Sequence, residues 1–397
     1  MKTKEVSRKT YAFFCCVSML VIGIQVAGYQ YILLDIADGF SLNLTGMGAL
    51  ASAQFLPNMI APLLFGGLVD KKNKKTLMLL CICAYALGSL VILFSSGVVF
   101  LVVGIVILGS GGALMPTILT VMLAEQNPAE SAFYANLVEV FYSAGTVVAP
   151  PLIALLMGLG MQWKGLYAIV VVLAILLFLL HLFLKTPSVP QKPLPHAAEQ
   201  GGLKAVLTPV GILLIVFGGV YCAVEGGFCN FLTPYFKEGL GADTQASLAL
   251  SMIGIAMVVV RLATAKINKH KEMMVVFSCL FGGVAALLMI LVPGKNSSFL
   301  WSILFGIAVA PAWPFMMSTA VDAFPHNAGR MTTLIMVGNG LGGMLVSPVM
   351  GFLSDHFGVI FSYSFVVLTA LVAAGCFFWI RKLRKAGESA LFREKSL

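Results

Sequence analysis

Two carboxyl side chains stand within long apolar stretches of this sequence. Glu139 directly precedes the run VFYSAGTVVAPPLIALLM, and Glu225 interrupts the run LLIVFGGVYCAVEGGF. An ionised carboxylate in hydrocarbon costs roughly 2.5–3.5 kcal/mol or more, so each acid should face a polar cavity or hold a proton. Asn136, Glu139 and Ser143 fall at i, i+3 and i+7, on one stripe of a helix. We predict that Glu139, and secondly Glu225, carries a proton; the alternative for both is a neutral acid that fixes helix packing.

Amide and aromatic side chains in similar stretches are candidates for contacting a polar cargo. Gln25 and Tyr29 share a helix face at i and i+4, and so do Gln54 and Asn58. The predicted cargo-binding set is Gln25, Tyr29, Gln54, Asn58, Asn136, Tyr221, Asn230, Trp313 and Asn339. We expect no strong cation near the middle of these stretches, which favours an uncharged, hydroxyl-rich cargo. For each amide the alternative is a hydrogen bond between helices, worth about 0.6 kcal/mol on average.

The composition indicates which solvent surrounds these residues. The chain of 397 residues is 59% hydrophobic and only 10% charged, and long uncharged runs recur along its length. About 20 such residues, at a rise of 1.5 Å each, cross the hydrocarbon core of a bilayer, so we predict an all-α integral membrane protein. The pattern predicts twelve transmembrane helices, at about residues 11–36, 45–69, 75–95, 98–124, 131–158, 164–184, 209–236, 244–267, 272–293, 298–322, 330–353 and 358–381.

The basic residues predict how these helices are oriented in a cell membrane. If both termini are cytoplasmic, 22 of the 25 Lys and Arg residues lie inside, and only Lys164, Lys237 and Lys295 lie outside. The net charge of +9 then favours membrane lipid over nucleic acid as a partner. The basic N-terminus followed by an apolar run imitates a signal peptide. Because no small-residue cleavage site follows the run, we expect a retained first helix.

A Pro-rich polar interval divides the helices into two sets of six. The predicted domains are an N-terminal six-helix bundle (1–185), a cytoplasmic linker (186–207) and a C-terminal six-helix bundle (208–397). The halves also repeat each other, because NLVEVFYSAGTVVAPPLIALL and TLIMVGNGLGGMLVSPVMGFL align at an offset of 197 residues. This offset matches Gly145 with Gly342 and Pro151 with Pro348. Two parallel repeats are typical of many secondary transporters.

Several other functions are disfavoured by the absence of their motifs. The sequence contains no G-x-x-x-x-G-K-[ST] motif, so we do not expect direct ATP hydrolysis. The five His residues lie at or beyond the predicted span ends, which disfavours a nucleophile–base pair. The eight Cys residues lack metal-ligand spacing and are interpreted as small apolar residues. We predict that the protein is not an enzyme and uses no cofactor, metal or nucleic acid.

The segment GGLVDKKNKK resembles the signature between helices 2 and 3 of the major facilitator superfamily, G-x-L-a-D-r-x-G-r-k. Asn73 stands where the signature has its second Gly, a tight-turn position that Asn can also occupy. The helix count, the linker and the repeat match that superfamily along the whole chain. The resemblance implies a gate at this loop and at its fainter second copy, where Ala265 replaces the acid. The implied gating residues are Gly66, Asp70, Lys71, Lys74 and Arg261.

Two branches of the superfamily share features with this chain. The segments YCAVEGGFCNFLTPYF and APAWPFMMSTA look like helices 7 and 10 of the fucose–proton symporter-like branch. The segment GTVVAPP instead resembles the helix 5 motif G-x-x-x-G-P of proton-coupled drug antiporters. The resemblance implies a secondary active transporter of a small molecule that works by alternating access. We favour proton-coupled symport of a sugar-like solute by a monomer. The alternatives are proton-coupled efflux of drugs or small metabolites, and a non-transporting membrane receptor.

Overall fold

Long α-helices make up almost all of the chain. The computed structural model describes the backbone of residues 8–71, 73–126, 130–183, 203–264, 267 and 270–395. The N-terminal half contains α1 (Arg8–Gly39), α2 (Leu44–Lys71), α3 (Lys74–Leu93), α4 (Val98–Gln126), α5 (Ser131–Gly158) and α6 (Lys164–Phe183). After the turn η2 (Leu203–Ala205), the C-terminal half contains α7 (Pro209–Asn230), α8 (Leu232–Pro234), η3 (Tyr235–Gly239), α9 (Asp243–Thr264), α10 (Lys271–Leu291), α11 (Lys295–Val309), α12 (Ala312–Ala323), α13 (Ala328–Phe357) and α14 (Val359–Lys395).

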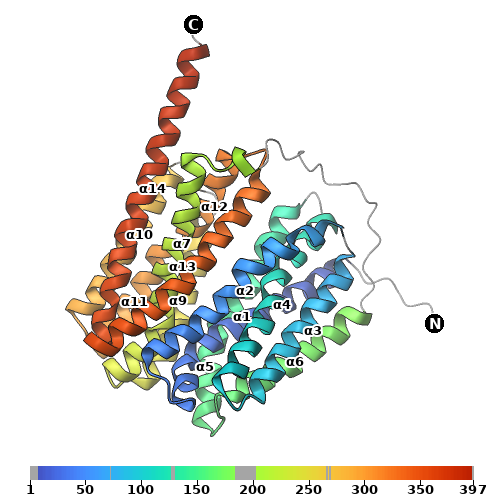
Figure 1. Ribbon diagram of the computed structural model, residues 1–397, viewed down its shortest axis with the longest axis vertical. Helices are drawn as coiled ribbons and strands as arrows, with labels where there is room; N and C mark the ends of the chain where they lie inside the picture. Colours follow the sequence, from blue (N-terminus) through green and yellow to red (C-terminus); the bar gives the residue numbers. More distant parts are fainter. Residues whose placement is uncertain are drawn as a thin grey trace.

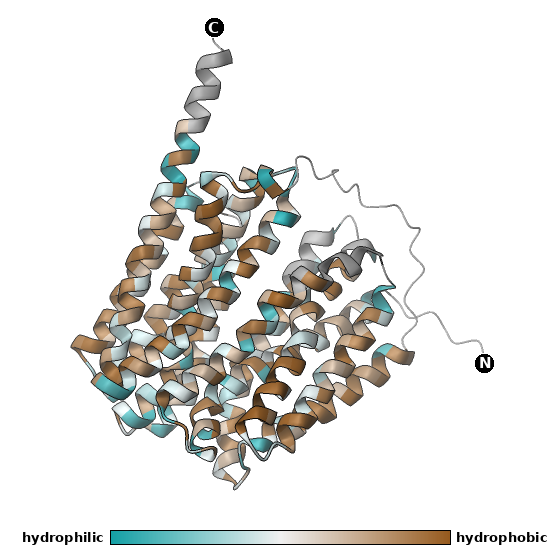
Figure 2. Ribbon diagram, in the orientation of Figure 1, coloured by the Kyte–Doolittle hydropathy of each residue, from teal (hydrophilic) through white to brown (hydrophobic). Residues whose placement is uncertain are grey.

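These elements confirm the predicted all-α membrane fold. Eleven stretches of the described chain have the length and hydropathy of a membrane span, and α2 is a further helix of 28 residues. The segments α7–α8–η3 and α11–α12 each count as one span because the chain continues in one direction through a short break. Hydrophobic residues cover the helices, and hydrophilic residues gather towards their ends (Figure 2). The linker prediction falls largely on residues 184–202, which lie outside the described residues, so the domain bounds stay a prediction.

The two halves form separate bundles that lie against each other (Figure 1). We call the end at which α1 begins and α6 ends the linker end, and the opposite end the distal end. In Figure 1 the bundles meet at the distal end and diverge towards the linker end, where α14 projects beyond its bundle. The described contacts between α2 and α13 run from Leu44 against Gly351 at the distal end to Met59 against Gly340 near mid-helix.

Pairs of glycines explain how helices approach closely within each half. A Cβ on Gly145 of α5 would lie 2.3 Å from the Leu20 carbonyl oxygen of α1. A Cβ on Gly342 of α13 would lie 2.0 Å from the Gly219 carbonyl oxygen of α7. Small residues allow backbones to touch in a membrane, where packing rather than water exclusion holds helices together. Gly145 and Gly342, which the sequence repeat aligns, therefore make the same contact in the two bundles.

The loop that resembles the superfamily signature is stabilised by a helix cap. Asn73 has φ −61° and ψ 112°, in the extended region rather than the left-handed region. Its side-chain oxygen accepts hydrogen bonds from the backbone N–H of Lys75 at 3.0 Å and of Thr76 at 3.4 Å. Asn is among the best N-cap residues because it satisfies donors that the first turn leaves free. Asn73 therefore replaces the signature glycine as the N-cap of α3.

Candidate functional site

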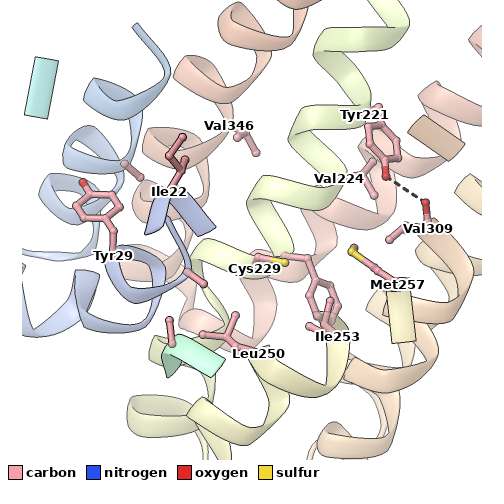
Figure 3. Packing of buried hydrophobic residues seen from close by; sticks show 14 of the residues in the cluster. Ile22, Tyr29, Tyr221, Val224, Cys229, Leu250, Ile253, Met257, Val309 and Val346 are labelled. Atoms are coloured by element: carbon pink, nitrogen blue, oxygen red, sulfur yellow. Dashed lines mark hydrogen bonds between the residues drawn. The ribbon is translucent and has the colours of Figure 1, made fainter. Parts of the chain in front are cut away.

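A break in the tenth span exposes backbone carbonyls at the centre of the C-terminal half. The break falls between α11 and α12, at Ala310 and Pro311. Pro314 has no N–H to offer the Ala310 carbonyl four residues earlier, and Arg261 of α9 donates its Nε–H to that oxygen at 3.2 Å. The Tyr221 hydroxyl of α7 donates to the neighbouring Val309 carbonyl at 3.1 Å (Figure 3). Irregular backbone is tolerated within a membrane when side chains satisfy it in this way.

Two acids and one arginine gather beside this break. Glu139 lies on α5 with an exposed side chain, and Arg261 of the other half is close enough to interact with it electrostatically. Tyr142, one turn after Glu139, interacts electrostatically with Glu139, Glu225 and Arg261. The cluster thus joins α5 of the N-terminal half to α7 and α9 of the C-terminal half. We call Glu139, Tyr142, Glu225 and Arg261 the charged cluster.

Aromatic rings form a wall next to the charged cluster. The rings of Tyr221 and Trp313 lie with centroids 6.1 Å apart, and the ring of Phe217 stacks on Tyr221 with centroids 5.9 Å apart. Tyr221 is buried, whereas Trp313 is half-buried and presents part of its surface. Flat aromatic faces beside carboxylates and a guanidinium can contact both the hydroxyl groups and the C–H faces of a small polar solute.

Polar contacts close the distal end of the molecule. The Asp355 carboxylate at the end of α13 accepts hydrogen bonds from the backbone N–H of Leu44 at 3.0 Å and of Thr45 at 2.9 Å. These donors belong to the first turn of α2, whose N-terminus attracts a negative charge. Lys237 of η3 also forms an ion pair with Asp35 of α1 at 3.0 Å. Both contacts join the two halves, so the distal end is closed in this structure.

The sequence of this chain matches a family model and a known transporter. The family model described as Major Facilitator Superfamily matches residues 13–305 and 275–396. This chain belongs to the major facilitator superfamily. The minor myo-inositol transporter IolF of Bacillus subtilis (strain 168) is 26% identical over 223 residues, which is 53% of this chain and 51% of that protein. The match thus spans about half the length of this relative.

Solved structures share the fold of this facilitator at low sequence identity. The inward-open xylose transporter XylE of E. coli matches with a TM-score of 0.78 and 13% identity, over 94% of this chain and 96% of that chain. The E. coli fucose:proton symporter FucP matches with a TM-score of 0.64 and 17% identity, over 94% of this chain and 99% of that chain. The predicted superfamily membership is confirmed, and the family and its neighbours are transporters rather than enzymes.

Four of the predicted cargo residues of the facilitator are engaged between helices, and one of them is Tyr221, whose hydroxyl donates to the Val309 carbonyl of α11. Gln25 is buried in the N-terminal bundle, where its Oε1 accepts a hydrogen bond from the Tyr85 hydroxyl at 3.5 Å. The buried Tyr29 donates its hydroxyl to the Leu50 carbonyl at 2.8 Å. Asn230, also buried, donates from Nδ2 to the Ser347 hydroxyl at 3.3 Å. These contacts correspond to the alternative of hydrogen bonds between helices.

The remaining predicted residues divide into accessible ones and undescribed ones. Gln54 and Asn339 are half-buried and Asn58 is exposed, so these three amides stay accessible on α2 and α13. Lys74 begins α3 at the linker end. The side-chain surroundings of Gly66, Asp70, Lys71 and Asn136 lie outside the described residues.

The sequence-based site lacked Tyr142, and it placed Arg261 at a gate. Tyr142 lies three residues after Glu139 on the same helical stripe, a spacing that could have indicated it. Arg261 lies three residues before the end of α9, and only the folded structure shows its side chain bonded to the break and near enough to Glu139 to interact electrostatically. Among the described residues, no three His, Cys, Asp or Glu side chains gather closely enough to hold a metal ion.

Proposed function

We propose that this facilitator is a secondary active transporter that moves a small, uncharged, hydroxyl-rich solute together with protons by alternating access. The known similarity to an inositol transporter supports a polyol or sugar as cargo. We further propose that the linker end faces the cytoplasm of a cell membrane, as the basic residues indicate. The structure then corresponds to the state that is closed towards the outside.

One observation carries the proposal of proton coupling. Glu139 and Arg261 belong to different halves, and they interact electrostatically while the distal end is closed. When the halves rock to open the distal end, the distance between Glu139 and Arg261 changes, and the affinity of Glu139 for a proton changes with it. An acid whose affinity for a proton differs between the two states couples proton movement to that conformational change.

The other residues of the site receive subordinate roles. Glu225 is the second candidate for the coupling acid because Tyr142 interacts electrostatically with both acids. The half-buried Trp313, whose ring lies beside that of Tyr221, is proposed to contact the cargo together with the accessible amides of α2 and α13. The proposed gating residues remain Gly66, Asp70, Lys71, Lys74 and Arg261.

Substitution of the coupling acid tests this proposal. Glu139→Gln imitates the protonated acid, so we expect it to retain exchange of labelled inositol or sugar across proteoliposome membranes. It should lose accumulation of the same solute driven by a proton gradient. Glu225→Gln, assayed in the same way, serves as the matched comparison. If Glu139→Gln concentrates solute as wild type does while Glu225→Gln does not, the coupling role belongs to Glu225. If neither substitution affects accumulation, the charged cluster is not the coupling site.

A further inference from the structure

Two prolines at equivalent positions of the repeat leave two backbone carbonyls without a helical partner. Pro151 in α5 and Pro348 in α13 lie inside their helices. Because proline has no N–H, the carbonyls four residues earlier, at Val147 and Met344, lose the hydrogen bond that an α-helix normally provides. Such a carbonyl in the membrane interior requires another donor.

Each of these carbonyls receives its hydrogen bond from a serine of the opposite half. Ser251 of α9 donates to the Val147 carbonyl of α5 at 2.7 Å. Ser52 of α2 donates to the Met344 carbonyl of α13 at 2.6 Å, which is shorter than its 3.1 Å distance to the Gly48 carbonyl of its own helix. The serines thus lie on the second span of each half, and the prolines lie on the fifth.

The described residues that line the grooves beside both hydrogen bonds are apolar, apart from the serines themselves. The bond of Ser251 borders a groove of about 500 Å³ between α5 and α9, whose other lining residues are apolar. The bond of Ser52 borders a groove of about 360 Å³ beside α2, with a similarly apolar lining. Each carbonyl therefore depends on the serine of the opposite half for as long as the distal end stays closed.

We infer that Ser52 and Ser251 are positioning residues for transport, which hold the distal end closed through these two carbonyls. We call each serine–carbonyl pair a seam latch. Rocking of the halves breaks both latches, and water entering the opened distal side then satisfies the carbonyls. Because the two latches are related by the repeat, they resist opening on both sides of the contact between the halves. The inference rests on the proposed alternating-access function.

Distances between spin labels at the distal end test the seam latches. Gln162 and Asn296 are exposed at the distal end of the N-terminal and C-terminal halves, so cysteines placed there, in a background without native cysteines, report opening. We expect Ser52→Ala and Ser251→Ala each to raise the ratio of distal-open to distal-closed protein about threefold, the effect of an average hydrogen bond between membrane helices. The double variant should raise it about tenfold. Ser251→Thr, which keeps the hydroxyl, should restore the wild-type ratio.

Two further variants test whether the serines hold the halves together or only provide a hydrogen bond to a carbonyl that lacks one. Ser247→Ala removes a buried hydroxyl one turn away on α9 that bonds only to its own helix, so it should leave the ratio unchanged. Adding Pro151→Ala to Ser251→Ala supplies the missing N–H to Val147 within α5. This double variant should recover thermal stability and yet keep the raised distal-open ratio.

Results with the serine variants and the Ser247 control can each overturn the inference. A ratio unchanged by both serine substitutions, or restored to the wild-type value by Pro151→Ala, shows that the serines only satisfy carbonyls. An equal shift in Ser247→Ala shows that any lost hydroxyl on α9 has the same effect. Solute flux in the same proteoliposomes is read separately. Absent flux in wild type would contradict the transport proposal, whereas the distance ratios would still decide the role of the serines.

Discussion

A close backbone contact between the two halves predicts a substitution that should force the distal end open. Gly48 of α2 lies against the backbone of α13, and a Cβ at this position would be 2.1 Å from the Ser347 carbonyl oxygen and 2.5 Å from its carbon. Carbon atoms in contact normally lie about 3.5–4.0 Å apart. Gly48→Ala therefore requires the two helices to separate by about 1 Å or more while the distal end stays closed.

The expected change in the distal-open population follows because this contact exists only in the distal-closed state. Extra volume in a packed contact costs typically ~1–3 kcal/mol, and here the cost applies only to the distal-closed state because opening separates the two helices. Since about 1.4 kcal/mol corresponds to a tenfold change in an equilibrium, the distal-open state should gain roughly 5- to 150-fold in relative population.

The labelled pair at Gln162 and Asn296 measures this shift, and a second glycine provides the control. Gly342→Ala creates an overlap of similar size, with its Cβ 2.0 Å from the Gly219 carbonyl, but both residues belong to the C-terminal half. It should lower the thermal stability of the protein without favouring either state. If folded Gly48→Ala protein shows the wild-type distance distribution, the halves do not separate at α2 and α13, and the reasoning fails.

Three further substitutions test contacts described above. Tyr221→Phe keeps the aromatic wall but removes the donor to the Val309 carbonyl, so the free energy of unfolding should fall by about 0.6–1.7 kcal/mol in a detergent titration; an unchanged value would show that the break needs no donor. Asn73→Ala should weaken the N-cap of α3 by about 1 kcal/mol and increase amide hydrogen exchange at residues 75 and 76 about fivefold, whereas Asn73→Asp should not. Asp35→Asn removes a partly exposed ion pair with Lys237 and should shift the labelled distances towards the open state by less than fivefold; a shift that grows at high salt would contradict a screened ion pair.

The sequence by itself determined that the chain lies in a bilayer, how many spans it has and that its two halves repeat each other. Uncharged runs of about 20 residues have no other stable place than a bilayer, and helices are the natural way to satisfy their backbone there. The repeat also aligned Gly145 with Gly342, and the structure shows that both positions make the same close backbone contact. The signature loop and the repeat together indicated the superfamily before any contact was known.

The tertiary structure alone decided which polar side chains meet. Helical spacing places Gln25 and Tyr29 on one stripe of α1, yet such a stripe can face a cavity or another helix. Here it faces other helices, because Gln25 bonds to Tyr85 and Tyr29 bonds to the Leu50 carbonyl. Arg261 reaches the Ala310 carbonyl, which lacks a helical donor because Pro314, 53 residues later in the chain than Arg261, has no N–H. The two serines of the seam latches likewise carry no distinguishing feature in the sequence. Their role depends on two prolines that are distant in the chain and lie opposite them only in the folded structure. Such pairings depend on the rotation and contact of whole helices, which local spacing does not specify.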